Sequence, residues 1–348
     1  MVESRVDRQQ ALDLFENCDL LELGEMAQAF RWRQHPQKKV TFAIDRNINY
    51  TNICECQCRF CAFYRRPEDV DAFVIDEAVL HQKIAETVEL GGTQILLQGG
   101  LHPDLKIDYY IGLLETIKKD FPVIHIHGFS PPEIFHIATL SKLSLGETLQ
   151  QLKKAGLGSI PGGGAEILDD RVRTLISPNK IGWRRWLEVM ETAHGLGLRS
   201  TATMMFGSLE TPKELVEHLF RVRDVQDRTG GFTAFIPWSF QPTNTALGYE
   251  VTQTATGIDY LRVLALSRLV LDNIDNLQAS WVTQGTKMAQ VALYFGANDF
   301  GSTMIEENVV AAAGVHFSSS LEELVDTIKE AGFAASQRDT LYNMIKDY

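Results

Sequence analysis

Four of the five cysteines of this chain lie within eight residues, at Cys54, Cys56, Cys58 and Cys61. Thiolates are soft ligands, and several of them in one loop can face a single metal centre without help from distant parts of the chain. Cys54, Cys58 and Cys61 have the spacing C-x3-C-x2-C, which supplies three thiolates to a cluster with four iron corners. The spacing therefore predicts a [4Fe-4S] cluster with one iron open to an outside ligand.

The same loop leaves other occupants open. Cys56 makes a fourth thiolate available, so the loop alone can also supply a closed iron–sulfur cluster or a zinc site without radical chemistry. A structural zinc site normally takes two separated pairs of ligands, and the chain has neither a second CxxC motif nor a downstream His pair. These features favour the three-cysteine cluster. Cys18, in an apolar run near the N-terminus, is expected to be a small core residue.

Length and composition restrict the class of protein. At 348 residues and 45% hydrophobic, the chain can bury a large core and exceeds the roughly 250 residues of a typical α/β barrel by about one accessory element. Its formal charge of −12 argues against a nucleic-acid-binding protein. The sequence has no apolar run long enough for a transmembrane helix and no signal peptide core, and clustered free cysteines suit a reducing compartment. We therefore expect a cytoplasmic protein that binds a small molecule and neither nucleic acid nor membrane.

The elements that must position the cysteines alternate between strands and helices. Eight strands are expected at residues 40–45, 93–98, 123–127, 157–161, 199–206, 231–237, 276–283 and 296–301. Amphipathic helices are expected between them, at residues 76–90, 107–121, 146–155, 183–196, 212–229, 258–273 and 287–295. The alternation predicts an α/β fold, a TIM-type (β/α)8 barrel, with a six-unit partial barrel as the alternative.

Two further segments flank the expected barrel. Residues 7–34 read as two helices capped by Asp7 and Asp19. Residues 320–348 read as a helix, a short extended piece and a second helix on the outside of the barrel. We therefore expect an N-terminal helical cap (1–36), the barrel (37–315) and a C-terminal extension packed on the barrel (316–348).

Glycine, polar or aromatic residues follow the carboxyl ends of the expected strands, where the active sites of such barrels lie. These strand-end residues include Gln98, Gly99, Gly100, Glu166, Trp238, Thr283, Gln284 and Asp299. Tight turns, helix capping and core packing also account for residues of these types, so only their shared position favours ligand contact. His125 and His127 alternate with isoleucines, which predicts that at least one of the two histidines points into the barrel.

Five motifs link the chain to a known family: YTNIC (50–54), FCAFYR (60–65), QGGLHP (98–103), SIPGGGAE (159–166) and ASWVTQG (279–285). On these motifs, the chain resembles the cyclic dehypoxanthine futalosine synthase family of the radical S-adenosylmethionine (radical SAM) superfamily, from about residue 47 to residue 342. The segments SPPE (130–133) and WSFQP (238–242) also resemble the cyclising enzymes. Aminofutalosine synthases and deazaflavin synthases of the F420 type are similar over much of the same length and remain the alternatives.

The resemblance implies that Cys54, Cys58 and Cys61 hold a [4Fe-4S] cluster and that its open iron binds S-adenosylmethionine. Cys56 is not part of the family's ligand motif. The residues then expected to contact this cofactor are Phe60, Gln98, Gly99, Gly100 and Glu166. Those expected to line the substrate space are Trp238, Thr283, Gln284 and Asp299.

The resemblance also implies the reaction, a step of menaquinone biosynthesis by the futalosine route. A 5′-deoxyadenosyl radical takes the hydrogen from C4′ of the ribose in dehypoxanthine futalosine, and the resulting radical adds to the benzoate ring. Loss of one electron and one proton restores the arene. His127, Glu166, Asp299 or a bound water are the candidate proton acceptors. An electron donor such as flavodoxin or ferredoxin is the implied protein partner.

Overall fold

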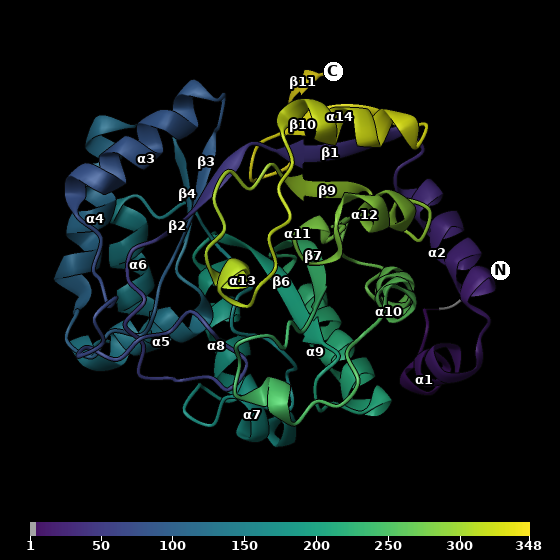
Figure 1. Ribbon diagram of the computed structural model, residues 1–348, viewed down its shortest axis with the longest axis horizontal. Coiled ribbons are helices and arrows are strands. Elements are labelled where there is room, and N and C mark those ends of the chain that lie inside the picture. The colour runs from purple at the N-terminus through teal and green to yellow at the C-terminus, as the bar shows by residue number, and fades with distance from the viewer. Residues whose placement is uncertain (1–4) are drawn as a thin grey trace.

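A computed structural model describes residues 5–348, which are organised around one parallel sheet (Figure 1). Its seven strands are neighbours in chain order, and every adjacent pair is parallel. They are β2 (Asp45–Asn49), β3 (Gln94–Gln98), β4 (His125–Gly128), β5 (Ser159–Ile160), β6 (Arg199–Phe206), β7 (Phe232–Ser239) and β8 (Asn276–Leu277). The α/β barrel predicted from the sequence is confirmed in its partial form, because these seven strands curve into a half-barrel.

A second sheet of four strands continues the first across its open side. It contains β1 (Lys39–Ala43), β9 (Asp299–Ser302), β10 (Ala334–Arg338) and β11 (Met344–Asp347), in the order β11-β10-β1-β9. Ile44 alone separates β1 from β2, and an isolated bridge pairs Gln278, just after β8, with Asp299 of β9. The two sheets therefore surround one interior, to which both contribute side chains.

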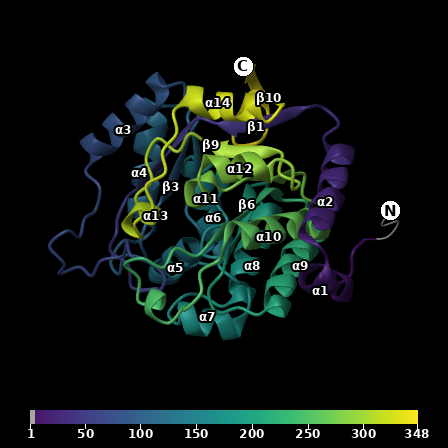
Figure 2. The ribbon, with the colours of Figure 1, turned by 45° about the vertical axis from the view of Figure 1, so that its right-hand side comes forward.

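Helices cover the outer side of the sheets (Figures 1 and 2). The longer ones are α1 (Arg8–Asn17), α2 (Leu20–Gln34), α3 (Glu77–Glu89), α4 (Ile107–Asp120), α5 (Pro131–Ser141), α6 (Leu145–Ala155), α8 (Trp183–Gly195), α9 (Pro212–Thr229), α10 (Gly257–Val270) and α14 (Leu321–Glu330). The shorter ones are α7 (Asp170–Ile176), η1 (Leu247–Tyr249), α11 (Trp281–Gln284), α12 (Thr286–Ala292) and α13 (Val309–Ala312). Between residues 5 and 348, no helix combines the length and the apolarity needed to cross a membrane.

Local sequence signals set the starts of the helices. The Asp7 side chain accepts a hydrogen bond from the Gln10 N–H in a capping box at the start of α1, and Asp19 caps α2. Both predicted N-terminal helices are confirmed, and they pack against α9 and α10 on the outer side of the barrel. Thr211 caps α9, and Pro212 occupies its first turn, where the missing N–H has no partner to lose.

The C-terminal residues differ from the sequence-based expectation. Met344–Asp347 form strand β11, antiparallel to β10, where a second helix was predicted. The reason is tertiary: β1 leaves the main sheet, its free edge pairs with β10, and β10 in turn pairs with β11. The extension also reaches the barrel interior, because Arg338, Thr340 and Tyr342 line the cavity.

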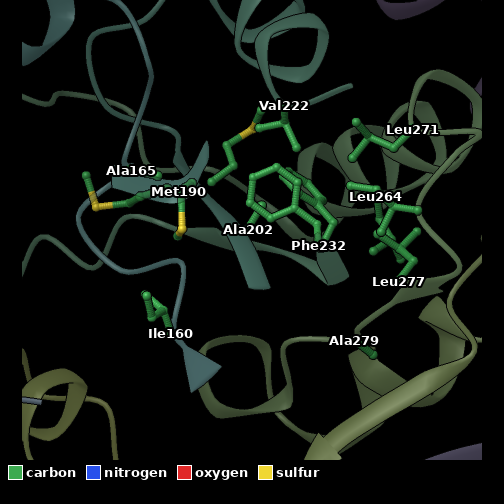
Figure 3. Packing of buried hydrophobic residues seen from close by; sticks show 14 of the residues in the cluster. Ile160, Ala165, Met190, Ala202, Val222, Phe232, Leu264, Leu271, Leu277 and Ala279 are labelled. Carbon is green, nitrogen blue, oxygen red and sulfur yellow. The ribbon is translucent and has the colours of Figure 1, made fainter. Parts of the chain in front are cut away.

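The apolar core lies between the main sheet and its helices. Figure 3 shows Val222 of α9 and Leu264 of α10 gathered near Ala202 of β6 and Phe232 of β7. Trp186 of α8 stacks on Phe232, with the ring centroids 6.3 Å apart. Burying an aliphatic or aromatic side chain of this size contributes about 1.5–3 kcal/mol. The core thereby fixes the strands whose carboxyl ends carry the site.

Candidate active site

One cavity of about 430 Å³ begins at the carboxyl ends of the parallel strands and extends into the barrel. Most of the residues predicted from the sequence line it: Cys54, Cys58, Phe60, Cys61, Gln98, Gly99, Gly100, Glu166, Trp238 and Thr283. Gln284 and Asp299, which were predicted to face the substrate, are not among the lining residues. The fold therefore brings the cysteine loop and most of the strand-end residues to one cavity.

Backbone hydrogen bonds hold the cysteine loop against three other segments. The Cys54 N–H donates to the Arg65 carbonyl at 3.0 Å, and the Glu55 N–H donates to the Leu101 carbonyl at 3.0 Å. On the other side, the Arg59 N–H donates to the carbonyl of Ile176 at 2.9 Å. These bonds fix the path of the loop without using a thiol, so the sulfur atoms stay available as ligands.

The four thiols of the loop lie close enough together to shift one another's pKa values. The Cys56 thiol lowers the pKa of Cys54 to about 6 and also lowers the pKa of Cys58, whereas burial raises the pKa of Cys61 to about 11. Cys56 itself is buried and contacts the Asn179 carbonyl, with S···O 3.6 Å. Among the described residues, no three His, Cys, Asp or Glu side chains are grouped tightly enough for a single metal ion. The donor set fits a larger, thiolate-held iron–sulfur cluster, because thiolates are the ligands such clusters take.

The glycine pair after β3 lies directly against the cysteine loop. A Cβ on Gly100 would lie 2.2 Å from the Ile53 carbonyl oxygen and 2.9 Å from Cys54 Cβ. Only glycine permits this approach. A Cβ on Gly99 would likewise lie 2.6 Å from the ring of Tyr50. The pair can therefore bring backbone N–H and C=O groups to a ligand bound beside the thiols.

Glu133, which was not among the predicted site residues, fastens this glycine pair. One carboxylate oxygen accepts hydrogen bonds from the Gly99 N–H at 3.0 Å and from the Tyr50 hydroxyl at 2.8 Å. The other accepts from the N–H and the hydroxyl of Ser130, the N-cap of α5. Burial raises the pKa of Glu133 to about 7 against the effect of these hydrogen bonds. The S-x-x-E pattern of a capping box was the sequence signal for this helix start.

Glu166 lies in the cavity wall between two cations. Lys180 Nζ is 2.9 Å from one carboxylate oxygen, and Arg173 Nη1 is 3.4 Å from the other. Burial by itself lowers the pKa of Lys180, but the negative charges of Cys58 and Glu166 outweigh burial and raise it. Lys180 Nζ also lies 5.0 Å from the centroid of the Phe60 ring. Lys180 follows α7 in a loop without any motif, so sequence reasoning missed it, and its charge can offset that of a thiolate-held cluster.

The residues predicted for the substrate side separate into two groups. Trp238 of β7 and Thr283 line the cavity, but Gln284 donates to the Ser239 hydroxyl at 2.6 Å. Thr283 and Gln284 belong to the single-turn helix α11, because β8 ends at Leu277 and not at the predicted residue 283. Gln284 is therefore engaged with the end of β7, and its prediction as a lining residue is not supported by its position.

Asp299 is fully buried, and its carboxylate binds other side chains instead of facing the cavity. Arg338 Nε and Nη2 donate to its two oxygens at 2.7 and 2.8 Å, and the Thr41 hydroxyl and the Gly301 N–H also donate to it. Arg338, which was not predicted, lines the cavity in its place. Asp299 was assigned to the carboxyl end of an expected strand, but it is the first residue of β9, and β10, which lies next to β1, brings Arg338 in front of it.

His127 of β4 lines the cavity, as the alternation along this strand predicted for at least one histidine. Its Nδ1 lies 2.6 Å from the Ser159 hydroxyl, which also lies 2.7 Å from His125 Nε2. Burial lowers the pKa of His127 to about 3 and that of His125 to about 4. Both imidazoles are therefore neutral at pH 7.

Two family models match the chain. The model described as the radical SAM superfamily matches residues 48–222, and the one described as the CofH/MqnC C-terminal region matches residues 229–347. The first match spans the cysteine loop and the glycine pair, and the second spans the segment that contributes Trp238, Thr283 and Arg338. Together the models cover both ends of the cavity.

Curated relatives match over nearly the whole chain. A cyclic dehypoxanthine futalosine synthase of Halalkalibacterium halodurans is 47% identical, covering 99% of this chain and 92% of the relative, and one of Streptomyces coelicolor is 46% identical, covering 97% and 85%. A 5-amino-6-(D-ribitylamino)uracil–L-tyrosine 4-hydroxyphenyl transferase of Methanothermobacter thermautotrophicus is 43% identical, covering 89% and 86%.

Solved structures agree on the fold. The hydrogenase maturase HydG of Carboxydothermus hydrogenoformans superposes with a TM-score of 0.75 at 17% identity, covering 97% of this chain and 78% of that one. Methylornithine synthase superposes with a TM-score of 0.72 at 15% identity, covering 95% and 94%. At such identities the superpositions speak for a shared fold.

Proposed function

The chain belongs to the radical SAM superfamily and, within it, to the family of the cyclic dehypoxanthine futalosine synthases, and we propose that it closes dehypoxanthine futalosine to its cyclic form in menaquinone biosynthesis. The observation that carries this proposal is the 47% identity to such a synthase over 99% of the chain. Enzymes of this superfamily use a [4Fe-4S] cluster and S-adenosylmethionine. The substrate is a small molecule, and the cavity of about 430 Å³ is of a size that suits one.

In this proposal, Cys54, Cys58 and Cys61 hold the cluster, and the cofactor lies against the residues beside them. These residues are Phe60, Gln98, Gly99, Gly100 and Glu166, all of which line the cavity. When bound, the cluster and S-adenosylmethionine supply a 5′-deoxyadenosyl radical that takes hydrogen from C4′ of the substrate ribose. Lys180 balances charge beside the thiols, and Glu133 keeps the glycine pair in position. An electron donor such as flavodoxin or ferredoxin reduces the cluster from outside.

The protein's own contribution to ring closure is confinement and orientation. The cavity lies within the barrel, and apolar residues such as Leu96, Ile236 and Trp281 form part of its wall. Such a wall excludes water and holds the ribose and the benzoate ring of one molecule close together. The attack of C4′ on the ring is then favoured over quenching of the substrate radical.

We infer a ranking of the three candidate acceptors for the proton that leaves the ring. Asp299 is shielded by Arg338, and Glu166 is held by Lys180 and Arg173. His127 lines the cavity without an ion pair, but burial, which lowers its pKa to about 3, makes it a weak base. His127 and Glu166 both line the cavity, and of these two His127 is the one without an ion pair; a bound water is the alternative.

Substrate deuterated at C4′ tests the proposal directly. With reduced, reconstituted enzyme, the 5′-deoxyadenosine that forms should carry one deuterium per cyclic product. Unlabelled 5′-deoxyadenosine would exclude abstraction from C4′. A parallel incubation with tyrosine and 5-amino-6-ribitylaminouracil tests the activity for which the archaeal relatives are named, and an enolpyruvyl benzoate tests the aminofutalosine alternative. Turnover of either in place of dehypoxanthine futalosine would assign the chain to a sister family.

A further inference from the structure

Two cationic side chains, Lys180 and Arg338, belong to the described residues that line the cavity. Lys180 lies at the cysteine loop, between Glu166 and the ring of Phe60. Arg338 ends β10, and the pairing of Gln337 with Phe42 puts it level with Ala43, just before β2 begins. The five residues of β2, at about 3.3 Å each, run from this level toward the cysteine loop. The two cations therefore mark opposite ends of the cavity.

The guanidinium of Arg338 is held in a fixed orientation. Nε and Nη2 donate to the two oxygens of Asp299, and Nη1 donates to the Asp339 carbonyl at 3.2 Å. Its plane lies against the Tyr342 ring, with 4.0 Å between the guanidinium carbon and the ring centroid. Because Asp299 also accepts from the Thr41 hydroxyl and the Gly301 N–H, it cannot follow a moving arginine. Because its orientation is already fixed, Arg338 loses little further side-chain conformational entropy when it binds a ligand.

These contacts leave part of the guanidinium free. Arginine has five N–H donors, and within residues 5–348 three of them are used, two on Asp299 and one on Asp339. One N–H on Nη1 and one on Nη2 have no partner among the described residues. A fork of two parallel N–H groups is the geometry that binds a carboxylate in bidentate fashion.

The groups around Arg338 suit a planar ligand that carries a carboxylate. The Gln278 side chain lines the same part of the cavity and has no hydrogen-bond partner among the described residues, and a Cβ on Gly301 would lie 2.6 Å from its Nε2. Asp45 also lines this region, and burial raises the pKa of its carboxyl. Above these polar groups, Leu96 and Ile236 offer apolar walls.

We propose that the remaining N–H groups of Arg338 bind the carboxylate of the substrate's benzoate ring at the deep end of the cavity, with Gln278 as a neighbouring donor. The ring then lies between the apolar walls, and the ribose points to the cysteine loop, where the hydrogen is taken. This inference rests on the proposed function and adds the residue that sets the direction of the substrate. It also explains why the arginine is fixed by a buried carboxylate that does not itself touch the ligand.

The test compares two ligands on reconstituted, unreduced full-chain protein, in which no turnover occurs. Isothermal titration gives the dissociation constants of dehypoxanthine futalosine and of its benzamide, in which the carboxylate is a carboxamide. The unaltered protein should prefer the acid by about 100-fold, the scale for a buried charge-assisted pair. In Arg338→Gln the preference should fall to about 3-fold or less, while the benzamide binds with little change.

A matched variant and a double variant guard against a folding defect. Arg268 is also buried, and its guanidinium donates to the Gly296 carbonyl and the Asn298 side-chain oxygen, but it does not line the cavity. Arg268→Gln should keep the full preference for the acid. The double variant Arg338→Gln/Asp299→Asn removes both charges of the pair and should lose the preference while leaving no unpaired buried charge.

Three results would overturn the inference, and they are distinguishable. If the unaltered protein binds acid and amide equally well, no carboxylate site exists although the proposed substrate stands. If the double variant still prefers the acid, the carboxylate is bound elsewhere, with Lys180 as the remaining cavity-lining cation. If neither ligand binds the unaltered protein, the proposed function fails and the carboxylate site fails with it.

Discussion

The two ends of the cavity are built in different ways. At the cysteine end, four thiols come from eight consecutive residues, and the neighbouring Gly100 fits only because it has no side chain. At the deep end, Arg338 binds Asp299 from another strand, and the Thr340 hydroxyl donates to Gln94 across 246 positions of the chain. Residue spacing along the chain therefore determines which groups meet at the cysteine end. The order of the strands in the sheets determines which groups meet at the deep end.

The largest expected effect distinguishes two cysteines of the same loop. Cys58→Ala should remove a cluster ligand and abolish both cluster formation and turnover, because three thiolates are needed. Cys56→Ala is the matched control and should keep the iron and sulfide content of the unaltered protein. Anaerobic reconstitution followed by iron and sulfide analysis and absorbance checks both. Loss of cluster iron in Cys56→Ala would place Cys56 among the ligands and remove the open iron corner.

At the deep end, the expected effect is on stability. Asp299→Asn leaves the buried charge of Arg338 without its partner, which should lower the free energy of unfolding by about 3–5 kcal/mol. The control is Glu188→Gln, which breaks a pair with the exposed Arg185 on the surface and should cost about 1 kcal/mol or less. Urea denaturation of the protein without cluster measures both. Equal losses in the two variants would mean that the buried pair contributes no more to stability than a surface pair.

Glu133, beside the glycine pair, should make stability depend on pH. Its pKa in the folded state is raised by burial from an ordinary 4.5 to about 7. A raised carboxyl pKa stabilises the fold below about pH 4.5, and this stability is lost as the pH rises through about 7, by about 3 kcal/mol at 1.36 kcal/mol per unit. Glu133→Gln should remove this slope. Urea midpoints of both proteins between these pH values measure it, and parallel curves would refute it.

A smaller loss is expected where the glycine pair meets the cysteine loop. In Gly100→Ala, the new Cβ would collide with the Ile53 carbonyl, so the loop must move by a fraction of an ångström or more. Misplacement on this scale lowers turnover by about 100-fold. Gly112→Ala, in an open position on α4, should instead raise stability by about 0.5–1 kcal/mol. Unchanged turnover in Gly100→Ala would mean that the loop tolerates displacement.

The smallest expected effect is at Glu166. Glu166→Gln keeps the shape of the side chain but removes the charge that Lys180 and Arg173 contact, and S-adenosylmethionine affinity should fall by about 10-fold. Equilibrium dialysis with labelled cofactor measures this, with the exposed Glu188→Gln as control. If affinity and turnover are both unchanged, the assignment of Glu166 to the cofactor is wrong.

Sequence patterns were sufficient for much of the fold. The predicted helix at 212–229 is α9 itself, and the predicted caps Asp7 and Asp19 begin α1 and α2. These features depend on neighbours in the chain, such as a capping side chain or an apolar repeat. The end of β8 and the strand β11 were missed, because the Tyr260 hydroxyl takes the Ser280 N–H and because β10 offers a partner edge. Neither reason is visible in a local window of sequence.

The same division holds for the site. The sequence by itself determined the thiols, the glycine pair and the polar mouth of the barrel, because their chemistry lies in residue types at short spacing. Only the tertiary structure decided that Lys180 stands beside Cys58, that Glu133 fastens Gly99 and that Arg338 takes the place predicted for Asp299. The physical reason is that burial gives a charge its effect, and burial depends on which strands and loops become neighbours in space.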